Sequence, residues 1–238
     1  MIVPAYNEER SLPVTLRELR SVAPDLDVVV IDDGSADGTG EAARVGGAEL
    51  VTLPFNVGVG GAVRAGLRFA QIQGYQRAVV LDADGQHDPA SIGDLLAALD
   101  AGADMAVGSR FSNELGGYGV GGLRKRAMRF LSLVVRVITG QRFTDTTSGF
   151  RAFDREVIEL LARDYPAEYL ADTVEALLLV LYAGHRVVEV ATPMRPRTAG
   201  RPSTRRLALV ANYLRLLIGI LGSASRRARR TPPTARSK

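Results

Sequence analysis

Apolar runs alternate with amphipathic segments along the chain, and the two patterns predict different elements. Short, continuously apolar runs are typical of strands that are buried on both faces of a parallel sheet. The predicted strands cover residues 2–3, 27–31, 48–53, 77–81, 103–107 and 186–190. Because helical segments separate these strands, the pattern indicates an α/β fold in which right-handed crossovers build a mostly parallel central sheet.

The helical segments carry apolar residues at every third or fourth position, as Leu12, Leu16 and Leu19 do. The predicted helices cover residues 8–22, 36–45, a segment from the glycine-rich loop 56–61 through residue 70, and residues 89–99, 123–139, 172–183 and 205–221. Residues 112–122, 144–153 and 195–203 are predicted to be loops.

An acid-rich segment, 82–88, directly follows the predicted strand 77–81. Asp82 and Asp84 are two positions apart, so in an extended chain both carboxylates would point the same way. Two close carboxylates repel each other unless a proton or a cation intervenes, and Mg²⁺ or Mn²⁺ prefers such oxygen ligands, to which Gln86 could add its carbonyl. Ligands of open α/β sheets bind beyond the carboxyl ends of the strands, where this segment falls. The alternative is a solvated acidic turn in which Asp88 caps the next helix.

Two further acidic segments follow the first two predicted strands. Tyr6 could stack on a base and Glu8 could accept a hydrogen bond from a base or ribose, although an acid in the first turn of a helix is also favourable. Asp32 and Asp33 could bind ribose hydroxyls or base nitrogens, and their alternative is a helix-capping turn. Three acidic segments at three strand ends are harder to explain by capping alone.

Two common phosphate-binding motifs are not matched. The glycine-rich loop continues as GVGGAV over 58–63, which lacks the last glycine of G-x-G-x-x-G and follows the third strand instead of the first. A dinucleotide site is therefore disfavoured. The sequence contains no G-x-x-x-x-G-K, which disfavours P-loop kinases and ATPases.

Composition narrows the compartment and the partners. The 238 residues include no cysteine, which excludes disulfides and thiolate metal sites, and only two histidines, which disfavours a His-rich zinc site. The formal charge of +4 is uneven, because six of the 30 Lys and Arg lie in 226–238 and the other 24 face 26 Asp and Glu. A basic tail favours an anionic surface over a nucleic-acid cleft as partner. No signal peptide and no apolar stretch long enough to span a membrane is visible.

Taken in order, several motifs resemble family 2 glycosyltransferases of the GT-A fold. They are VPAYNEE at 3–9, IDDGS at 31–35, Asn56 with its glycine loop, DADGQ at 82–86 and GSR at 108–110. The segment DTTSGFR at 145–151 resembles the dolichyl-phosphate mannose synthase branch and its bacterial polyprenyl-phosphate relatives. The resemblance spans residues 1 to about 205 and implies one Rossmann-like GT-A domain. We expect this domain to cover 1–222, with a nucleotide-sugar half (1–110) and an acceptor half (111–222), and the basic residues 223–238 to form a disordered tail.

The resemblance implies the inverting transfer of a hexose, mannose or glucose, from a nucleotide sugar (GDP-mannose or UDP-glucose) to a polyprenyl phosphate. It assigns Mg²⁺ or Mn²⁺ to Asp82, Asp84 and Gln86, and the donor phosphates to Arg110. The residues that it assigns to the nucleotide are Pro4, Tyr6, Glu8, Ile31, Asp32, Asp33, Asn56 and Asp82. Those that it assigns to the acceptor are Arg124, Ser148, Arg151, Arg197 and Arg201. The chain departs from the pattern at Thr204, where relatives often carry lysine.

The residue types suit the implied reaction. A divalent metal and an arginine stabilise the negative charge that accumulates on a leaving nucleoside diphosphate. The acceptor phosphate is already an anion that arginines can orient, so a general base is not strictly needed. Asp84, Arg110, Arg124 and Arg197 would carry these catalytic roles. Two alternatives are a family 2 enzyme with a soluble or saccharide acceptor in cell-envelope polysaccharide synthesis, and a non-catalytic nucleotide-binding protein at the membrane.

A peripheral position on the cytoplasmic, inner face of the cell membrane is expected from the C-terminal segment. Within 205–221, apolar residues fall on one helical face: Leu207, Val210, Ala211, Leu214, Leu217, Ile218 and Leu221. A core helix packed on the sheet is the alternative. The six basic residues of the tail favour the membrane, because each Lys or Arg near an anionic leaflet contributes about 1 kcal/mol.

Overall fold

The structure is a computed structural model that describes residues 1–110, 122–166, 172–193 and 195, and of 122–128 only the backbone. These residues belong to one compact unit, Met1–Arg201. The predicted helix 205–221 and the basic tail lie outside the described residues, so these predictions and the boundary at 222 stay untested.

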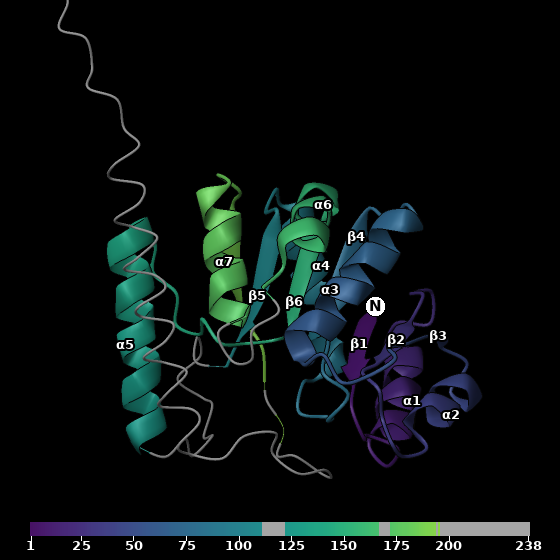
Figure 1. Ribbon diagram of the computed structural model, residues 1–238. Helices are drawn as coiled ribbons and strands as arrows, with labels where there is room; N and C mark the ends of the chain where they lie inside the picture. Colours follow the sequence, from purple (N-terminus) through teal and green to yellow (C-terminus); the bar gives the residue numbers. More distant parts are fainter. Residues whose placement is uncertain (111–121, 167–171, 194, 196–238) are drawn as a thin grey trace, which may run out of the picture. The chain divides into compact units, whose positions relative to one another are not determined.

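The described part of the chain forms a seven-stranded sheet in the order β3-β2-β1-β4-β6-β5-β7 (Figure 1). The strands are β1 (Ile2–Ala5), β2 (Val29–Asp32), β3 (Glu49–Thr52), β4 (Arg77–Val80), β5 (Met105–Ser109), β6 (Arg151–Asp154) and β7 (Val187–Ala191). All run parallel except β6, which pairs antiparallel with both β4 and β5. The predicted α/β fold with a mostly parallel sheet is therefore confirmed.

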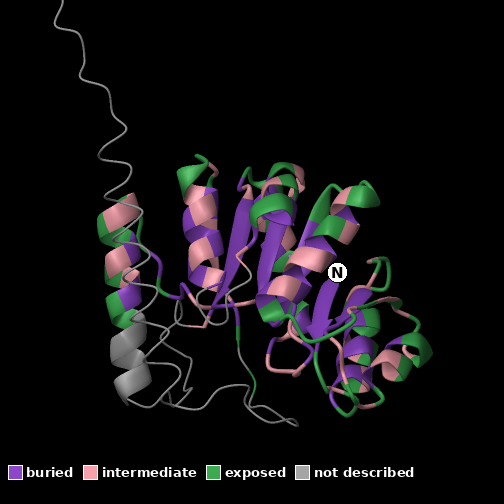
Figure 2. Cartoon of the chain, viewed as in Figure 1, coloured by how far each residue is buried: buried purple, intermediate pink, exposed green. Residues whose placement is uncertain are grey.

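Helices cover both faces of the sheet. They are α1 (Leu12–Val22), α2 (Thr39–Val45), α3 (Val59–Ile72), the 3₁₀ turn η1 (Pro89–Ser91), α4 (Ile92–Asp100), α5 (Gly122–Thr139), α6 (Arg155–Asp164) and α7 (Asp172–Tyr182). The apolar faces of α1 and α4 join the strands in one core, seen as the buried interior of Figure 2. On the other face α3 and α6 pack together, and Gly66 of α3 lies so close to β1 that a Cβ there would be 2.3 Å from the Ile2 Cγ2 atom.

The strand order creates the place where a ligand is expected. From β1 the chain builds outward to β2 and β3, and then returns to place β4 on the other side of β1. Such a reversal leaves a crevice outside the carboxyl ends of the strands. We call this edge of the sheet the carboxyl edge. The three acidic segments follow β1, β2 and β4, which are neighbours, so the fold gathers them there.

Two elements, β6 and α6, were not predicted. The sequence indicates a loop over 144–153, but residues 151–154 form a strand inserted between β4 and β5. Ala152 and Phe153 are both buried, so this strand shows no polar alternation, and Asp154 then caps α6 by accepting a hydrogen bond from the Val157 N–H at 2.9 Å. A four-residue strand followed at once by a helix leaves little periodic signal.

Candidate functional site

The loops that follow β1 and β2 are fastened to each other at the carboxyl edge. The Asn7 N–H donates to the Ser35 hydroxyl at 3.0 Å, and the Asn7 side-chain oxygen accepts from the Ala36 N–H at 2.9 Å. Next to it, the Glu8 N–H donates to the Thr39 hydroxyl at 2.8 Å. Asn7 has a positive φ of 55°, a conformation that Asn tolerates better than most residues. Residues 6–8 therefore form a fixed turn, and α1 begins at Leu12 instead of at the predicted residue 8.

The residues assigned to the nucleotide base differ in exposure. Tyr6 is 49% exposed and can offer its ring, whereas Pro4 and Ile31 are buried in β1 and β2. Glu8 precedes the helix, and its carboxylate accepts a hydrogen bond from the Ser11 hydroxyl. Tyr6 is thus the side chain of this group that is most available for stacking.

Asp32 and Asp33 hold backbone at the site. The Asp33 carboxylate accepts from the Val57 N–H at 2.7 Å and the Gly58 N–H at 2.9 Å, which ties the glycine-rich loop to β2. Asp32 accepts from the Ser35 N–H at 3.0 Å. Burial raises the pKa of Asp33, the two backbone hydrogen bonds oppose that effect, and the charge of Asp32 adds to it. Asn56 also contacts Gly58, whose N–H lies 3.2 Å from its side-chain oxygen.

The acidic segment after β4 forms a tight turn. Asp84 lies in this turn and Gly85 has a φ of 70°, so the extended geometry expected for 82–84 is wrong. The Asp84 carboxylate accepts from the Gln86 N–H at 3.0 Å, and the Asp82 Oδ2 atom lies 3.4 Å from Nε2 of the buried His87. The capping role considered for Asp88 is confirmed, since it accepts from the Ala90 N–H at 3.1 Å.

The loop before β6 encloses Arg110. Asp145, which is fully buried, receives two hydrogen bonds from the guanidinium of Arg110, at 2.6 and 2.8 Å, and Thr147 receives another at 2.8 Å. Burial would raise the pKa of Asp145, but the hydrogen bonds and charge of Arg110 outweigh it and hold the pKa below its usual value. Glu189 of β7 supports the loop by accepting from the Asp145 N–H at 2.7 Å. Arg110 is thus positioned at the carboxyl edge by Asp145 and Thr147.

The same loop packs directly on the acidic turn. A Cβ at Gly149 would lie 3.2 Å from the Asp82 Oδ2 atom, and the rings of Phe150 and His87 have centroids 5.1 Å apart. Glycine at 149 therefore allows the loop backbone to approach the Asp82 carboxylate. The structure brings together the two motifs that the sequence places about 60 residues apart.

Ser148 lies inside this loop and Arg151 begins β6 directly after it, and each is only 2% exposed. The Arg151 guanidinium donates to the backbone oxygens of Ser148 at 2.8 Å and Thr146 at 3.2 Å. Its Nη1 atom has no hydrogen-bond partner among the described residues. Both side chains support the loop from within, and a direct role toward an acceptor stays a prediction.

Three supporting residues were not predicted. Besides Glu189, Asp172 at the start of α7 is buried near Arg151, and burial raises its pKa to about 6. Arg195 joins three segments: its N–H donates to the Gln86 backbone oxygen at 2.8 Å, and its guanidinium contacts Glu18 and Asp88 at 2.8 and 3.0 Å. The sequence did not indicate these supporting roles, because the residues that they contact are distant in the chain.

Three residues assigned to the acceptor cannot be placed as side chains. Arg124 lies in the first turn of α5, where the structure describes only the backbone. Arg197 and Arg201 lie outside the described residues. Their roles stay predictions.

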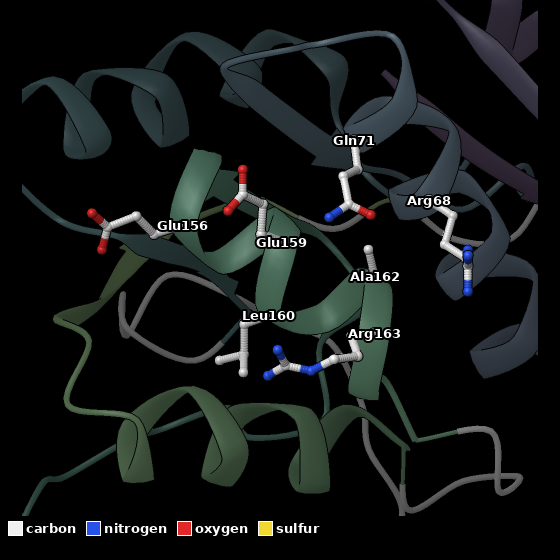
Figure 3. Close-up of a pocket in the computed structure, with 7 residues that line it drawn as sticks. All are labelled: Arg68, Gln71, Glu156, Glu159, Leu160, Ala162 and Arg163. Carbon is white, nitrogen blue, oxygen red and sulfur yellow. The ribbon is translucent and has the colours of Figure 1, made fainter.

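Two cavities lie away from these motifs. One of about 480 Å³ is lined by α3 and α6, and Figure 3 shows its labelled side chains pointing in different directions. The other, of about 700 Å³, includes Met1, Asp27 and Tyr75. Neither is lined by a residue of the acidic turn, so neither replaces the carboxyl edge as the candidate site.

The donor set at the acidic turn suits a hard divalent cation that is shared with a substrate. In the described part of the chain, no group of three or more His, Cys, Asp or Glu is arranged to hold a metal by itself. Asp82 and Asp84 supply two carboxylates, and Gln86 supplies a neutral oxygen. Mg²⁺ and Mn²⁺ accept such oxygen ligands, and Mg²⁺ is usually bound by one or two carboxylates together with substrate phosphates.

Comparison with known proteins identifies the family. Residues 1–161 match the family model described as glycosyl transferase family 2. The chain belongs to this family. The resemblance stated from the sequence motifs is confirmed, and this glycosyltransferase carries the acidic turn within the matched region.

Curated relatives and solved structures refine the comparison. The glycosyltransferase is 36% identical over 207 residues to the undecaprenyl-phosphate mannosyltransferase of Micrococcus luteus, covering 84% of each chain. It is 37% identical over 174 residues to the polyprenol monophosphomannose synthase of Mycolicibacterium smegmatis, covering 67% of this chain and 62% of that one. Glucosyl-3-phosphoglycerate synthase of Mycobacterium tuberculosis, crystallised with Mn²⁺, UDP and phosphoglyceric acid, superposes with a TM-score of 0.71 at 18% identity, covering 93% of this chain and 77% of that one. The last likeness confirms the GT-A fold.

Proposed function

We propose that this glycosyltransferase transfers a hexose, mannose or glucose, from GDP-mannose or UDP-glucose to a polyprenyl phosphate, with inversion at the anomeric carbon. The observation that carries the proposal is the packing of the 145–151 loop on the acidic turn, with Gly149 against Asp82. Two relatives at 36% and 37% identity are named for polyprenyl-phosphate mannosyl transfer, which supports this acceptor class.

The metal is proposed to be Mg²⁺ or Mn²⁺, held by Asp82, Asp84 and the Gln86 oxygen together with the donor diphosphate. Such an ion supplies charge neutralisation for the nucleoside diphosphate as the glycosidic bond breaks. The hydrogen bond from the Gln86 N–H to the Asp84 carboxylate preserves the turn that presents these ligands. The presence of Mn²⁺ in solved structures of the same fold supports a divalent ion in general.

The chain's own residues orient the two substrates. Tyr6 is exposed beside the β1 end and is proposed to stack on the base. Arg110 is proposed to contact the donor phosphates with the guanidinium that Asp145 and Thr147 hold in place. Arg124, Arg197 and Arg201 are proposed to orient the acceptor phosphate, whose anionic oxygen attacks without a general base.

The proposed location is the cytoplasmic, inner face of the cell membrane, where a lipid phosphate would be reached from the surface. Among the described residues, no helix has the length and hydropathy needed to cross a bilayer.

A transfer assay tests the proposal. Radiolabelled GDP-mannose and UDP-glucose are incubated with undecaprenyl phosphate, with a soluble sugar acceptor, or with water alone. We expect a labelled lipid product of inverted configuration only with the lipid phosphate. A product formed on the soluble acceptor would contradict the proposed acceptor. No turnover of either donor under any condition would contradict the proposed transfer itself.

Asp84→Asn tests the metal assignment. The substitution keeps the side-chain shape and the turn but removes one anionic ligand, so we expect transfer to fall by about a hundredfold or more while the unfolding midpoint stays near that of the unmodified chain. EDTA should abolish transfer by the unmodified chain, and Mg²⁺ or Mn²⁺ should restore it. Undiminished activity of Asp84→Asn, or activity in EDTA, would contradict the assignment.

A further inference from the structure

One side of α5 is apolar although it faces solvent. Phe130, Leu133 and Val137 are 49%, 53% and 76% exposed, and their spacing of three and four residues places them in one stripe along the helix. On the opposite side, Leu131 and Val135 are buried, and α5 packs against α7. The outer stripe is therefore separate from the side that holds the helix to the fold. Figure 2 shows these exposed turns of α5 on the side away from α7.

The charge of α5 has a single sign. Its sequence contains five basic residues and no acidic residue: Arg124, Lys125, Arg126, Arg129 and Arg136. Arg129 and Arg136 are exposed next to the outer stripe. A surface helix in water normally presents a polar face with both signs of charge. An apolar stripe with only positive neighbours is typical of helices that lie in a membrane interface.

We propose that the outer stripe of α5 (Phe130, Leu133 and Val137, flanked by Arg129 and Arg136) docks on the surface of a bilayer that contains anionic phospholipids. The three apolar side chains enter the acyl boundary, and the two guanidinium groups meet lipid phosphates. The inference rests on the proposed function in one respect, because a polyprenyl phosphate acceptor resides in such a bilayer.

Charge complementarity favours this partner over other parts of the same chain. Residues 202–238 contain no acid and nine basic residues: Arg205, Arg206, Arg215, Arg226, Arg227, Arg229, Arg230, Arg236 and Lys238. That segment and α5 would repel each other, whereas both attract an anionic surface. The same repulsion opposes a contact between the α5 helices of two copies.

A fluorescent reporter tests the contact directly. The chain contains no tryptophan, so Leu133→Trp introduces a single indole on the stripe of the full-length protein. With vesicles of phosphatidylglycerol and phosphatidylcholine, we expect its emission to shift to the blue and to be quenched by brominated lipids. Val45→Trp is the matched control, because Val45 of α2 is 80% exposed and lies outside the stripe. Its emission should not change.

Binding by the stripe is tested with polar replacements. The double variant Leu133→Gln with Val137→Gln should bind these vesicles about tenfold more weakly. The control double variant Val45→Gln with Ile72→Gln alters side chains that are also exposed and should bind normally. All variants should transfer sugar equally to a short, water-soluble prenyl phosphate. If the unmodified chain fails in that assay while the Leu133→Trp reporter still shifts, the proposed function is wrong and the docking surface stands.

Three results would overturn the docking surface. The first is vesicle binding without any change in the emission of the Leu133→Trp reporter. The second is a blue shift without vesicles that disappears when residues 203–238 are deleted, which would assign the stripe to the chain's own C-terminal segment. The third is a shift without vesicles that grows with protein concentration, which would assign it to a second copy.

Discussion

The buried charged side chains of the described part gather at the carboxyl edge. They are Asp32 at the end of β2 and Asp33 directly after it, Asp145 in the loop before β6, Arg151 at the start of β6 and Asp172 in the first turn of α7. A buried charge costs free energy unless it is paired or hydrogen-bonded. Their concentration at one edge indicates a site whose backbone is held rigidly by polar contacts, which is what oriented group transfer requires.

The Arg110–Asp145 pair should be the most costly of these contacts to break. Asp145→Asn leaves the guanidinium of Arg110, 10% exposed, without its bidentate anionic partner. We expect the free energy of unfolding to fall by about 3 kcal/mol in urea denaturation. Glu41→Gln is the control, because Glu41 and its partner Arg44 are 69% and 64% exposed and such pairs contribute about 1 kcal/mol at most. Similar losses in both variants would contradict the structural role of Asp145.

Asp172 should make stability depend on pH. Burial, with smaller contributions from the charges of Asp82 and Glu175, raises its folded pKa to about 6 from an ordinary value of 3.8, against the Thr173 N–H and Arg151. Because the folded pKa is raised, the contribution of protonated Asp172 to stability is fully present below about pH 4 and is lost as the pH rises through about 6. We therefore compare the unfolding free energy of Asp172→Asn with that of the unmodified chain at two pH values. The variant minus unmodified difference should be about 1.5 kcal/mol more positive at pH 8 than at pH 5. An equal difference at the two pH values would contradict this pKa.

At the scale of elements, the sequence predicted helices and strands correctly where the hydrophobic pattern extended over the whole element. The parallel strands and most helices were predicted within a few residues, because continuous apolar runs and helical spacing persist over whole elements. The antiparallel strand β6 was missed, since a four-residue strand buried among β4 and β5 is defined by its neighbours and not by its own pattern.

The candidate site could also be predicted only in part. Its three acidic segments were placed correctly at one edge, because the ends of neighbouring parallel strands must meet. Contacts across the sheet could not be foreseen: Glu189 with Asp145 and Arg195 with Gln86 join residues that are far apart in sequence. Nor did the sequence indicate that Asp33 would hold the glycine-rich loop instead of leaving both carboxylate oxygens to a ligand.

The close approach of α3 to β1 gives a test at the scale of elements. A methyl group at Gly66 would lie 2.3 Å from the Ile2 Cγ2 atom, so Gly66→Ala must displace the buried Ile2 side chain or the helix and should lower the unfolding free energy by about 1–3 kcal/mol. At Gly93 of α4 an added methyl group would meet no atom within 4 Å, so Gly93→Ala should instead stabilise by up to about 1 kcal/mol. Thermal unfolding of both variants should show shifts of opposite sign. Equal shifts in unfolding temperature would mean that close packing does not exclude a larger side chain at position 66.

For the whole molecule, residues that are far apart in the sequence together position the groups at the carboxyl edge. Residues 1–110 supply the acidic turn and Arg110, whereas residues 145–151 and Arg195 position these two groups by direct contact. A substitution in the 145–151 loop should therefore change the kinetic parameters for the nucleotide-sugar donor as well as those for the acceptor.

The basic tail provides the last test, because it separates electrostatic attraction from catalysis. Deleting residues 223–238 removes six basic residues and no acid, which is a loss of several kcal/mol of attraction to an anionic leaflet at about 1 kcal/mol each. Sedimentation with phosphatidylglycerol vesicles should fall sharply at low salt, and the difference from the full chain should shrink at high salt, where such attraction is screened. Transfer to a short, water-soluble prenyl phosphate should persist, since the tail supplies no group proposed for the reaction. If the truncated chain binds vesicles as well as the full chain at both salt concentrations, the tail does not tether the enzyme, and apolar contacts must account for any membrane binding.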